Sequence, residues 1–82
     1  MSYEIRYSKE TEAQADDLPV EAAAPLVLLL ERMGSDPWQY PQYNIAEFPD
    51  LRAAFFGSCG MAVFHVSERR RTITIVHIAW LD

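Results

Sequence analysis

The chain has 82 residues, of which half are hydrophobic and one is cysteine. This length fits one small domain over 1–82, and a single cysteine excludes an intramolecular disulfide and a Cys/His metal motif. Seven Lys and Arg against twelve Asp and Glu give a net charge of −5, which disfavours a general nucleic-acid binder because phosphate backbones repel an acidic surface.

The first elements expected in chain order are a short strand and a short helix. Tyr3–Tyr7 alternates apolar and charged residues, as a half-buried strand does. Ser8 is placed to cap a helix over Lys9–Leu18, and Pro19 ends it, because the residue before a proline avoids helical geometry. The start of the chain does not have the pattern of a signal peptide. We therefore expect a cytoplasmic protein.

The main helix is predicted over Glu21–Met33, with Gly34 as its C′ residue. Its centre is apolar on almost every side, which indicates burial on more than one face. Its apolar stretch is too short to cross a bilayer, so no membrane contact is expected. Pro25 fits either a helix that begins there or a helix that bends there, and the pattern leaves both open.

The second half of the chain predicts loops and strands. Residues 35–44 contain two prolines and three aromatics without periodicity, which indicates a loop. Residues 45–56 read as a strand interrupted by Pro49, which favours an edge position or a bulge. Residues 57–60 form a turn. The fold class is therefore α+β: two N-terminal helices packed on a mostly antiparallel four-stranded sheet, in the order β-α-α-β-β-β.

The two strongest strands, Met61–Ser67 and Thr72–Leu81, are expected to pair as a hairpin around the turn 68–71. If Ser67 pairs with Thr72, regular alternation makes both faces of the hairpin apolar. Two helices can cover only one of these faces, so the other should meet a partner. The residues predicted for this partner interface, which could also support a homodimer, are Met61, Val63, Val76, Ile78 and Trp80.

Candidate chemical groups are few. His65 and His77 fall on opposite faces of the predicted hairpin, without a carboxylate placed in sequence to orient either one. Cys59 lacks a basic neighbour that would lower the pKa of its thiol. No phosphate-binding loop or metal-ligand spacing is present, so we expect neither a cofactor nor a metal. Arg69, Arg70 and Arg71 form a basic turn that predicts either a solvated tip or a contact with nucleic acid or an acidic partner.

The segments "YEIRYSKETEAQADDLP", "LLERMGSDP", "DLRAAF" and "GMAVFHVSERRRTITIVHIAWLD" follow in an order that resembles the RelE/ParE superfamily of bacterial toxins. The resemblance covers nearly the whole chain. It implies a toxin of a type II toxin–antitoxin pair, silenced by a cognate antitoxin protein. It also implies one of two targets: messenger RNA cut on the ribosome without a metal, as in RelE-like members, or DNA gyrase, as in ParE-like members.

Carried over by position, the resemblance makes Arg52 a candidate phosphate contact. A ribonuclease would use Arg52 and His65 as catalytic residues, with the turn Arg69–Arg71, in place of the usual set. Met61 stands where the family commonly has an arginine, and Ala79–Leu81 replaces a Gly-His-Arg-like end. Loss of cationic groups from a phosphoryl-transfer site costs orders of magnitude in rate. We therefore expect growth inhibition by target binding; the alternatives are a ribosome-dependent endoribonuclease and a non-toxic interaction module with the same fold.

Overall fold

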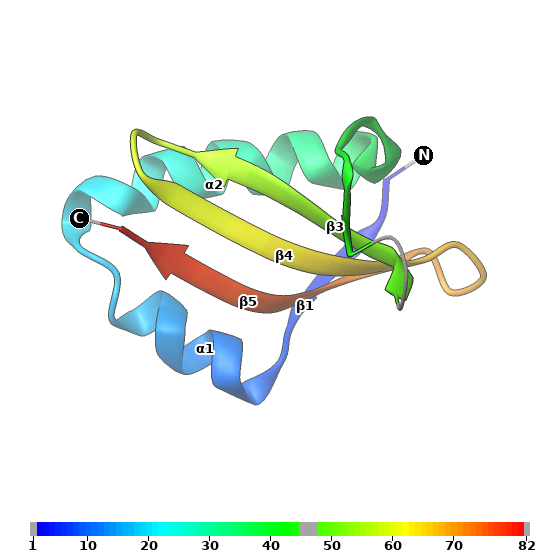
Figure 1. Ribbon diagram of the computed structural model, residues 1–82, viewed down its shortest axis with the longest axis horizontal. Helices are drawn as coiled ribbons and strands as arrows, with labels where there is room; N and C mark the ends of the chain where they lie inside the picture. Colours follow the sequence, from blue (N-terminus) through cyan, green and yellow to red (C-terminus); the bar gives the residue numbers. More distant parts are fainter. Residues whose placement is uncertain (1, 45–47, 82) are drawn as a thin grey trace.

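The computed structural model describes residues 2–44 and 48–81. Both helices precede the long strands, and α2 lies along one face of the sheet (Figure 1), which confirms the predicted α+β class. No helix in this part of the chain is long and apolar enough to cross a membrane. The elements in order are β1 (Glu4–Tyr7), α1 (Lys9–Asp16), α2 (Val20–Ser35), the 3-10 helix η1 (Pro37–Gln39), β2 (Gln42–Asn44), β3 (Phe48–Phe56), β4 (Gly60–Ser67) and β5 (Thr72–Trp80).

The sheet has five strands in the order β1-β5-β4-β3-β2, one more than predicted. β1 pairs with β5 in parallel, and the other neighbours are antiparallel. The additional strand, β2, lies in the segment predicted as a loop. Tyr40 precedes a proline and is extended, with φ −93° and ψ 149°, as this position requires. The extended chain then pairs Gln42 with Arg52 at the edge of the sheet.

The interruption expected at Pro49 falls within β3, where the pairing with β2 shifts register. Residues 45–47, the start of the strand predicted over 45–56, lie outside the described residues. From Leu51 to Phe56, β3 pairs regularly with β4.

The short helix begins where the sequence predicts, because the Ser8 hydroxyl accepts a hydrogen bond from the backbone N–H of Thr11 at 3.2 Å. The main helix is longer than predicted at both ends. It begins at Val20 and continues through Pro25, so the alternative in which the helix begins at Pro25 is wrong. The prediction of Gly34 as the C′ residue is wrong: Gly34 lies inside α2 and is buried, and its carbonyl accepts from the N–H of Tyr3 at 2.9 Å. The helix packs closely against the start of β1 at this point.

The core lies between α2 and the sheet, and α1 packs against β5. Phe64 of the central strand β4 and Met33 of α2 are both completely buried. Gln14 of α1 reaches the part of β5 that extends beyond β1, and its Oε1 accepts from the N–H of Ile78 at 2.8 Å. This contact satisfies a backbone donor that has no neighbouring strand there.

The hairpin of β4 and β5 follows the predicted register only near its turn. Ser67 pairs with Thr72 and Phe64 pairs with Ile75, as predicted. The predicted register, continued from Ser67 and Thr72, pairs Ala62 with His77. This pairing is wrong, because the register shifts and Ala62 pairs with Ile78. One extra residue in β5 makes this β-bulge, and regular alternation could not anticipate it.

Candidate functional site

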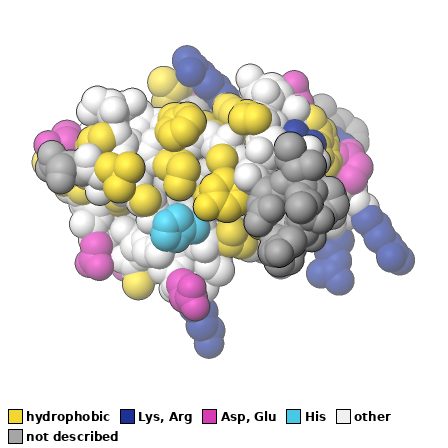
Figure 2. All heavy atoms as spheres, in the orientation of Figure 1, with side chains coloured by type: hydrophobic (Ala, Val, Ile, Leu, Met, Phe, Trp, Pro, Cys, Tyr) yellow, Lys and Arg dark blue, Asp and Glu magenta, His cyan; other side chains and the backbone are white. Residues whose placement is uncertain are grey.

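One face of the sheet is left uncovered by the helices, and we call it the open face. Successive side chains of a strand point to opposite faces, and α2 covers the face that carries Phe56, Phe64 and Ile75. Figure 2 shows hydrophobic side chains gathered on the open face over the long strands, with a histidine beside them. Its residues are Leu51, Ala53 and Phe55 on β3, Met61, Val63 and His65 on β4, and Thr74, Val76, His77 and Ala79 on β5.

The apolar residues of the open face form adjacent pairs. Phe55 is opposite Met61, and Ala53 is opposite Val63. Phe55 is 77% exposed, whereas Val63 is only 3% exposed among its neighbours. An aromatic ring exposed to this extent beside other apolar side chains is typical of an interaction surface.

The predicted partner interface divides between the two faces. Met61, Val63 and Val76 lie on the open face, the first and last of them half-buried. Ile78 and Trp80 do not, because the bulge turns them toward α2. Ile78 belongs to the core, and the Trp80 ring packs against that of Phe56 with 5.8 Å between centroids.

The two candidate catalytic residues, Arg52 and His65, point to opposite faces of the sheet. Arg52 pairs with the buried Phe64 across the strands, whereas His65 is exposed on the open face. The Arg52 guanidinium lies 4.6 Å from the centre of the Trp38 ring and donates to the carbonyl of Tyr40 at 2.6 Å. The structure therefore does not bring this pair together around one substrate atom.

The three arginines of the basic turn have different surroundings. Arg69 and Arg70 are exposed, whereas Arg71 is half-buried. The Arg71 guanidinium bonds to Glu68 at 2.6 Å and lies 4.1 Å from the centre of the Tyr3 ring. Arg71 also has a positive backbone φ of 56°, which residues other than glycine adopt only at a cost in free energy. Its contacts bind the turn to β1, so the exposed cations at the tip are Arg69 and Arg70.

A polar cluster around Glu68 was not predicted from the sequence. One carboxylate oxygen of Glu68 accepts from the Tyr3 hydroxyl at 2.6 Å and from the Trp38 ring N–H at 2.7 Å. Both bonds lower the pKa of the Glu68 carboxyl, and the bond from Tyr3 has the larger effect. The bond to Glu68 raises the pKa of the Tyr3 hydroxyl. The cluster joins Tyr3, the residue before β1, to η1 and the basic turn. These residues are far apart in sequence, so no local spacing reveals the cluster.

Other potential chemical groups are dispersed. Cys59 is a free, half-buried thiol in the turn before β4. The His77 ring nitrogen Nδ1 lies 3.3 Å from the Gln14 side-chain nitrogen. Within the described residues, no three His, Cys, Asp or Glu side chains converge in a way that could hold a metal ion.

No family model and no curated protein sequence matches the chain. Solved structures match it over nearly its whole length. A chain of the toxin–antitoxin complex RelBE2 from Mycobacterium tuberculosis aligns with a TM-score of 0.86 and 13% identity, covering 99% of this chain and 100% of that one.

The toxin RelE of E. coli, in a mutant form, is also similar. Bound to a peptide of its antitoxin RelB, it aligns with a TM-score of 0.84 and 13% identity, over 100% of this chain and 86% of that one. In the free state, the mutant RelE aligns with a TM-score of 0.79 and 13% identity, over 98% of this chain and 84% of that one. This chain therefore has the fold of RelE toxins, and the resemblance predicted from the sequence is confirmed at the level of the fold.

Proposed function

We propose that this protein is the toxin component of a type II toxin–antitoxin system, that it inhibits growth by binding its target, and that a cognate antitoxin neutralises it. The similarity to chains solved together with antitoxins supports this assignment. The surface proposed to contact the target is the open face, centred on the exposed Phe55 and the half-buried Met61.

The observation that carries binding over cleavage is the absence of Lys and Arg from the open face of the long strands. Among the described residues, β3, β4 and β5 contain one Lys or Arg, Arg52, and it points to the other face, whereas the basic residues on the open face are His65 and His77. Arg6 of β1 lies at the rim, and its guanidinium bonds to Glu4 at 2.9 Å. Cleavage of a phosphodiester needs positive groups where charge develops in the transition state. An apolar face instead gains free energy when a partner covers it.

The test is tightly controlled expression in a bacterial host. We expect the wild-type chain to arrest growth while messenger RNA stays intact. Phe55→Glu places a charge in the exposed apolar patch and should relieve the arrest. Val20→Glu is the matched control, because Val20 is 90% exposed but lies at the start of α2. Circular dichroism and protein level would verify that both variants fold.

The remaining outcomes separate the alternatives. Ribosome-dependent cuts in messenger RNA that disappear in Arg52→Ala or His65→Ala would support the endoribonuclease in place of the binding toxin. If growth continues unchanged when the wild-type chain is expressed at a high level, the result would support the non-toxic interaction module. Rescue of growth by the product of an adjacent reading frame would identify the antitoxin, and sedimentation of the chain alone would test the predicted homodimer.

A further inference from the structure

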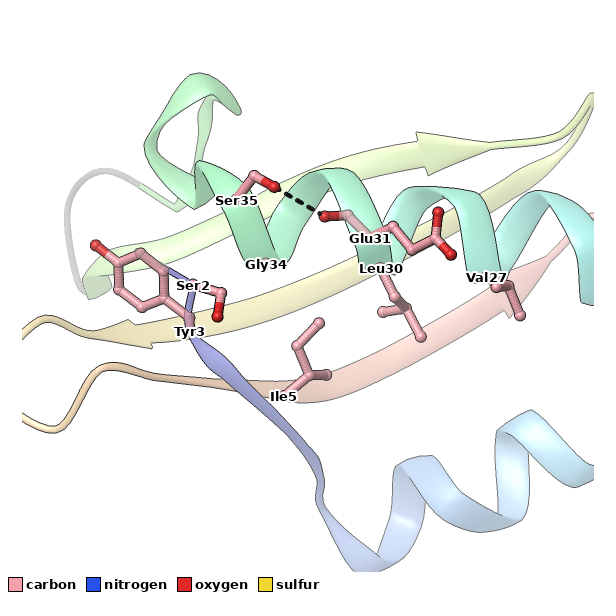
Figure 3. Close-up of a pocket in the computed structure, with 8 residues that line it drawn as sticks. All are labelled: Ser2, Tyr3, Ile5, Val27, Leu30, Glu31, Gly34 and Ser35. Atoms are coloured by element: carbon pink, nitrogen blue, oxygen red, sulfur yellow. Dashed lines mark hydrogen bonds between the residues drawn. The ribbon is translucent and has the colours of Figure 1, made fainter.

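Helix α2 has a hollow on each of two sides. One, of about 340 Å³, lies between α2 and β1, and the side chains of Val27 and Leu30 point into it (Figure 3). The other, of about 180 Å³, lies between α2 and the end of β3, and we call it the β3 hollow. Sites for drug-sized molecules measure about 300–1,000 Å³, so the β3 hollow is of a size for one side chain. Its lining residues are Pro25, Leu28, Leu29, Arg32, Tyr40, Phe55, Phe56 and Gly57.

The β3 hollow is apolar at one end and polar at the other. A Cβ added at Gly57 would lie 3.4 Å from the Cβ of Pro25, so the turn after β3 meets α2 at the apolar end. Arg32 lines the hollow seven residues further along α2, which is about 10 Å at the rise of a helix. Leu28, which is 47% exposed, forms the apolar wall between the two ends.

The polar end of the β3 hollow favours an anion. Burial raises the pKa of the Tyr40 hydroxyl, the nearby charge of Arg32 lowers it, and that of Asp36 raises it. The hydroxyl therefore stays protonated and can donate a hydrogen bond. Asp36 itself does not line the hollow, and its carboxylate accepts from the N–H of Trp38 at 3.2 Å. A guanidinium and a hydroxyl at one end of an apolar hollow are groups that recognise a carboxylate.

The backbone beside the β3 hollow is a short free edge of the sheet. Among the described residues, β2 accompanies β3 only as far as Ala53, whose N–H donates to the carbonyl of Pro41 at 3.1 Å. Because the backbone groups of successive residues point to alternate sides of a strand, those of Phe55 point the same way as those of Ala53, away from β4. One residue of a further strand can pair with the N–H and C=O of Phe55.

The position of Pro41 determines which chain fits this edge. Pro41 occupies the edge at Ala53, so an added strand has to end there. Arg32 lies at the same end, because Tyr40, the residue before Pro41, lines the hollow with it. A strand antiparallel to β3 would end there with its carboxylate, which Arg32 attracts. A parallel strand would begin there with an ammonium group, which Arg32 repels.

We propose that the β3 hollow binds the carboxyl terminus of a partner polypeptide whose last residue is aliphatic. The penultimate residue pairs with the backbone of Phe55, and its side chain lies beside the Phe55 ring, because directly opposite residues share a face. The last residue lies opposite Ala54, and its side chain enters the hollow beside Leu28. Its carboxylate bonds to the Arg32 guanidinium and the Tyr40 hydroxyl. Such binding goes beyond growth inhibition and occurs whether or not the chain is a toxin.

The probe is N-acetyl-valyl-leucine, added to the full chain, with the C-terminal amide of the same dipeptide as the matched ligand. We expect the acid to bind about fivefold more tightly than the amide. At saturation the acid should slow hydrogen exchange at the amide of Phe55 and leave that of Ala54, which points to β4, little changed. A methyl group on the valine nitrogen should weaken binding at least about tenfold. The same group on the leucine nitrogen should not, because that nitrogen faces away from β3.

Two adjacent residues of α2 provide matched variants. Arg32→Gln should weaken binding of the acid about fivefold, to the affinity of the amide, which should itself not change. Glu31→Gln is the control, because Glu31 lines the hollow on the β1 side, and it should retain the preference for the acid. Equal affinity of the wild-type chain for acid and amide would overturn the proposal. So would a preference that survives Arg32→Gln, or exchange at Phe55 that the acid leaves unchanged.

Other occupants give distinct results. An internal acidic segment would be indicated if an amidated peptide with aspartate after the leucine bound as tightly as the acid. A second copy of this chain would appear as a concentration-dependent dimer that the acid dissociates. Either result would overturn the chain-end proposal. Growth arrest without binding of the acid would refute this site and leave the toxin assignment intact, whereas binding without arrest would refute the toxin assignment alone.

Discussion

The assignment of the two sheet faces predicts that Phe64→Ala and Phe55→Ala differ greatly in their cost to stability. Phe64 is fully buried, and its ring meets that of Tyr40 edge-on with 5.9 Å between centroids. A buried aromatic side chain removes about 150–250 Å² from water, which at about 25 cal/mol per Å² corresponds to about 4–6 kcal/mol. Phe55 is 77% exposed, so about a quarter of that area, or about 1 kcal/mol, is at stake.

Urea unfolding followed by circular dichroism measures both changes. A domain of this length has an unfolding free energy of about 4–12 kcal/mol, so Phe64→Ala removes a large part of it. Phe64→Leu is the milder variant if the alanine form does not fold, and it should still cost more than Phe55→Ala. Equal losses at the two positions would refute the assignment of the open face, and with it the reason for choosing Phe55 as a target contact.

Three further changes test local features. The pKa of Glu68 is lowered in the folded protein, so its bonds stabilise the fold above the pKa of the unfolded state, and this stabilisation is lost as pH falls through the folded pKa. In Glu68→Gln, the free energy of unfolding should therefore depend less on pH in the acid range. Gly57→Ala should cost about 1–2 kcal/mol, because Gly57 has φ +61° and an added Cβ would lie 3.1 Å from the Trp80 ring; an unchanged urea midpoint would contradict this. Gln14→Ala should cost about 1–3 kcal/mol by leaving the Ile78 N–H without its acceptor, and faster amide exchange at Ile78 would show it.

The sequence predicted correctly those features that depend on residues close together in the chain. The Ser8 cap follows from a hydroxyl placed before a helix, and the pairing of Ser67 with Thr72 follows from a short turn between β-branched strands. The long helix was also predicted, although its end was placed too early at Gly34. That glycine lies inside the helix, where an added Cβ would meet Ile5 at an ordinary van der Waals distance of 3.7 Å, so the glycine marks neither a helix end nor a contact that requires glycine.

Features that depend on distant parts of the chain were not predicted. The composition of β2 alone indicates a loop, and the segment is a strand because its backbone pairs with β3. The Glu68 carboxylate meets Tyr3 and Trp38, which lie 65 and 30 residues away in sequence. Arg52 was a candidate for phosphate binding because of its position in the family resemblance, and only the register of β3 shows that it faces Trp38.

The bulge in β5 determines which residues are available for binding. Without it, alternation would place Ile78 and Trp80 on the open face and His77 in the core. Burial of a large apolar side chain contributes about 1.5–3 kcal/mol, more than the about 0.5–1.5 kcal/mol of one ladder hydrogen bond. The shifted register is therefore favoured, and Gln14 accepts from the Ile78 N–H at the strand edge. Substitutions at Ile78 and Trp80 accordingly test folding, whereas those at Phe55 and Met61 test recognition.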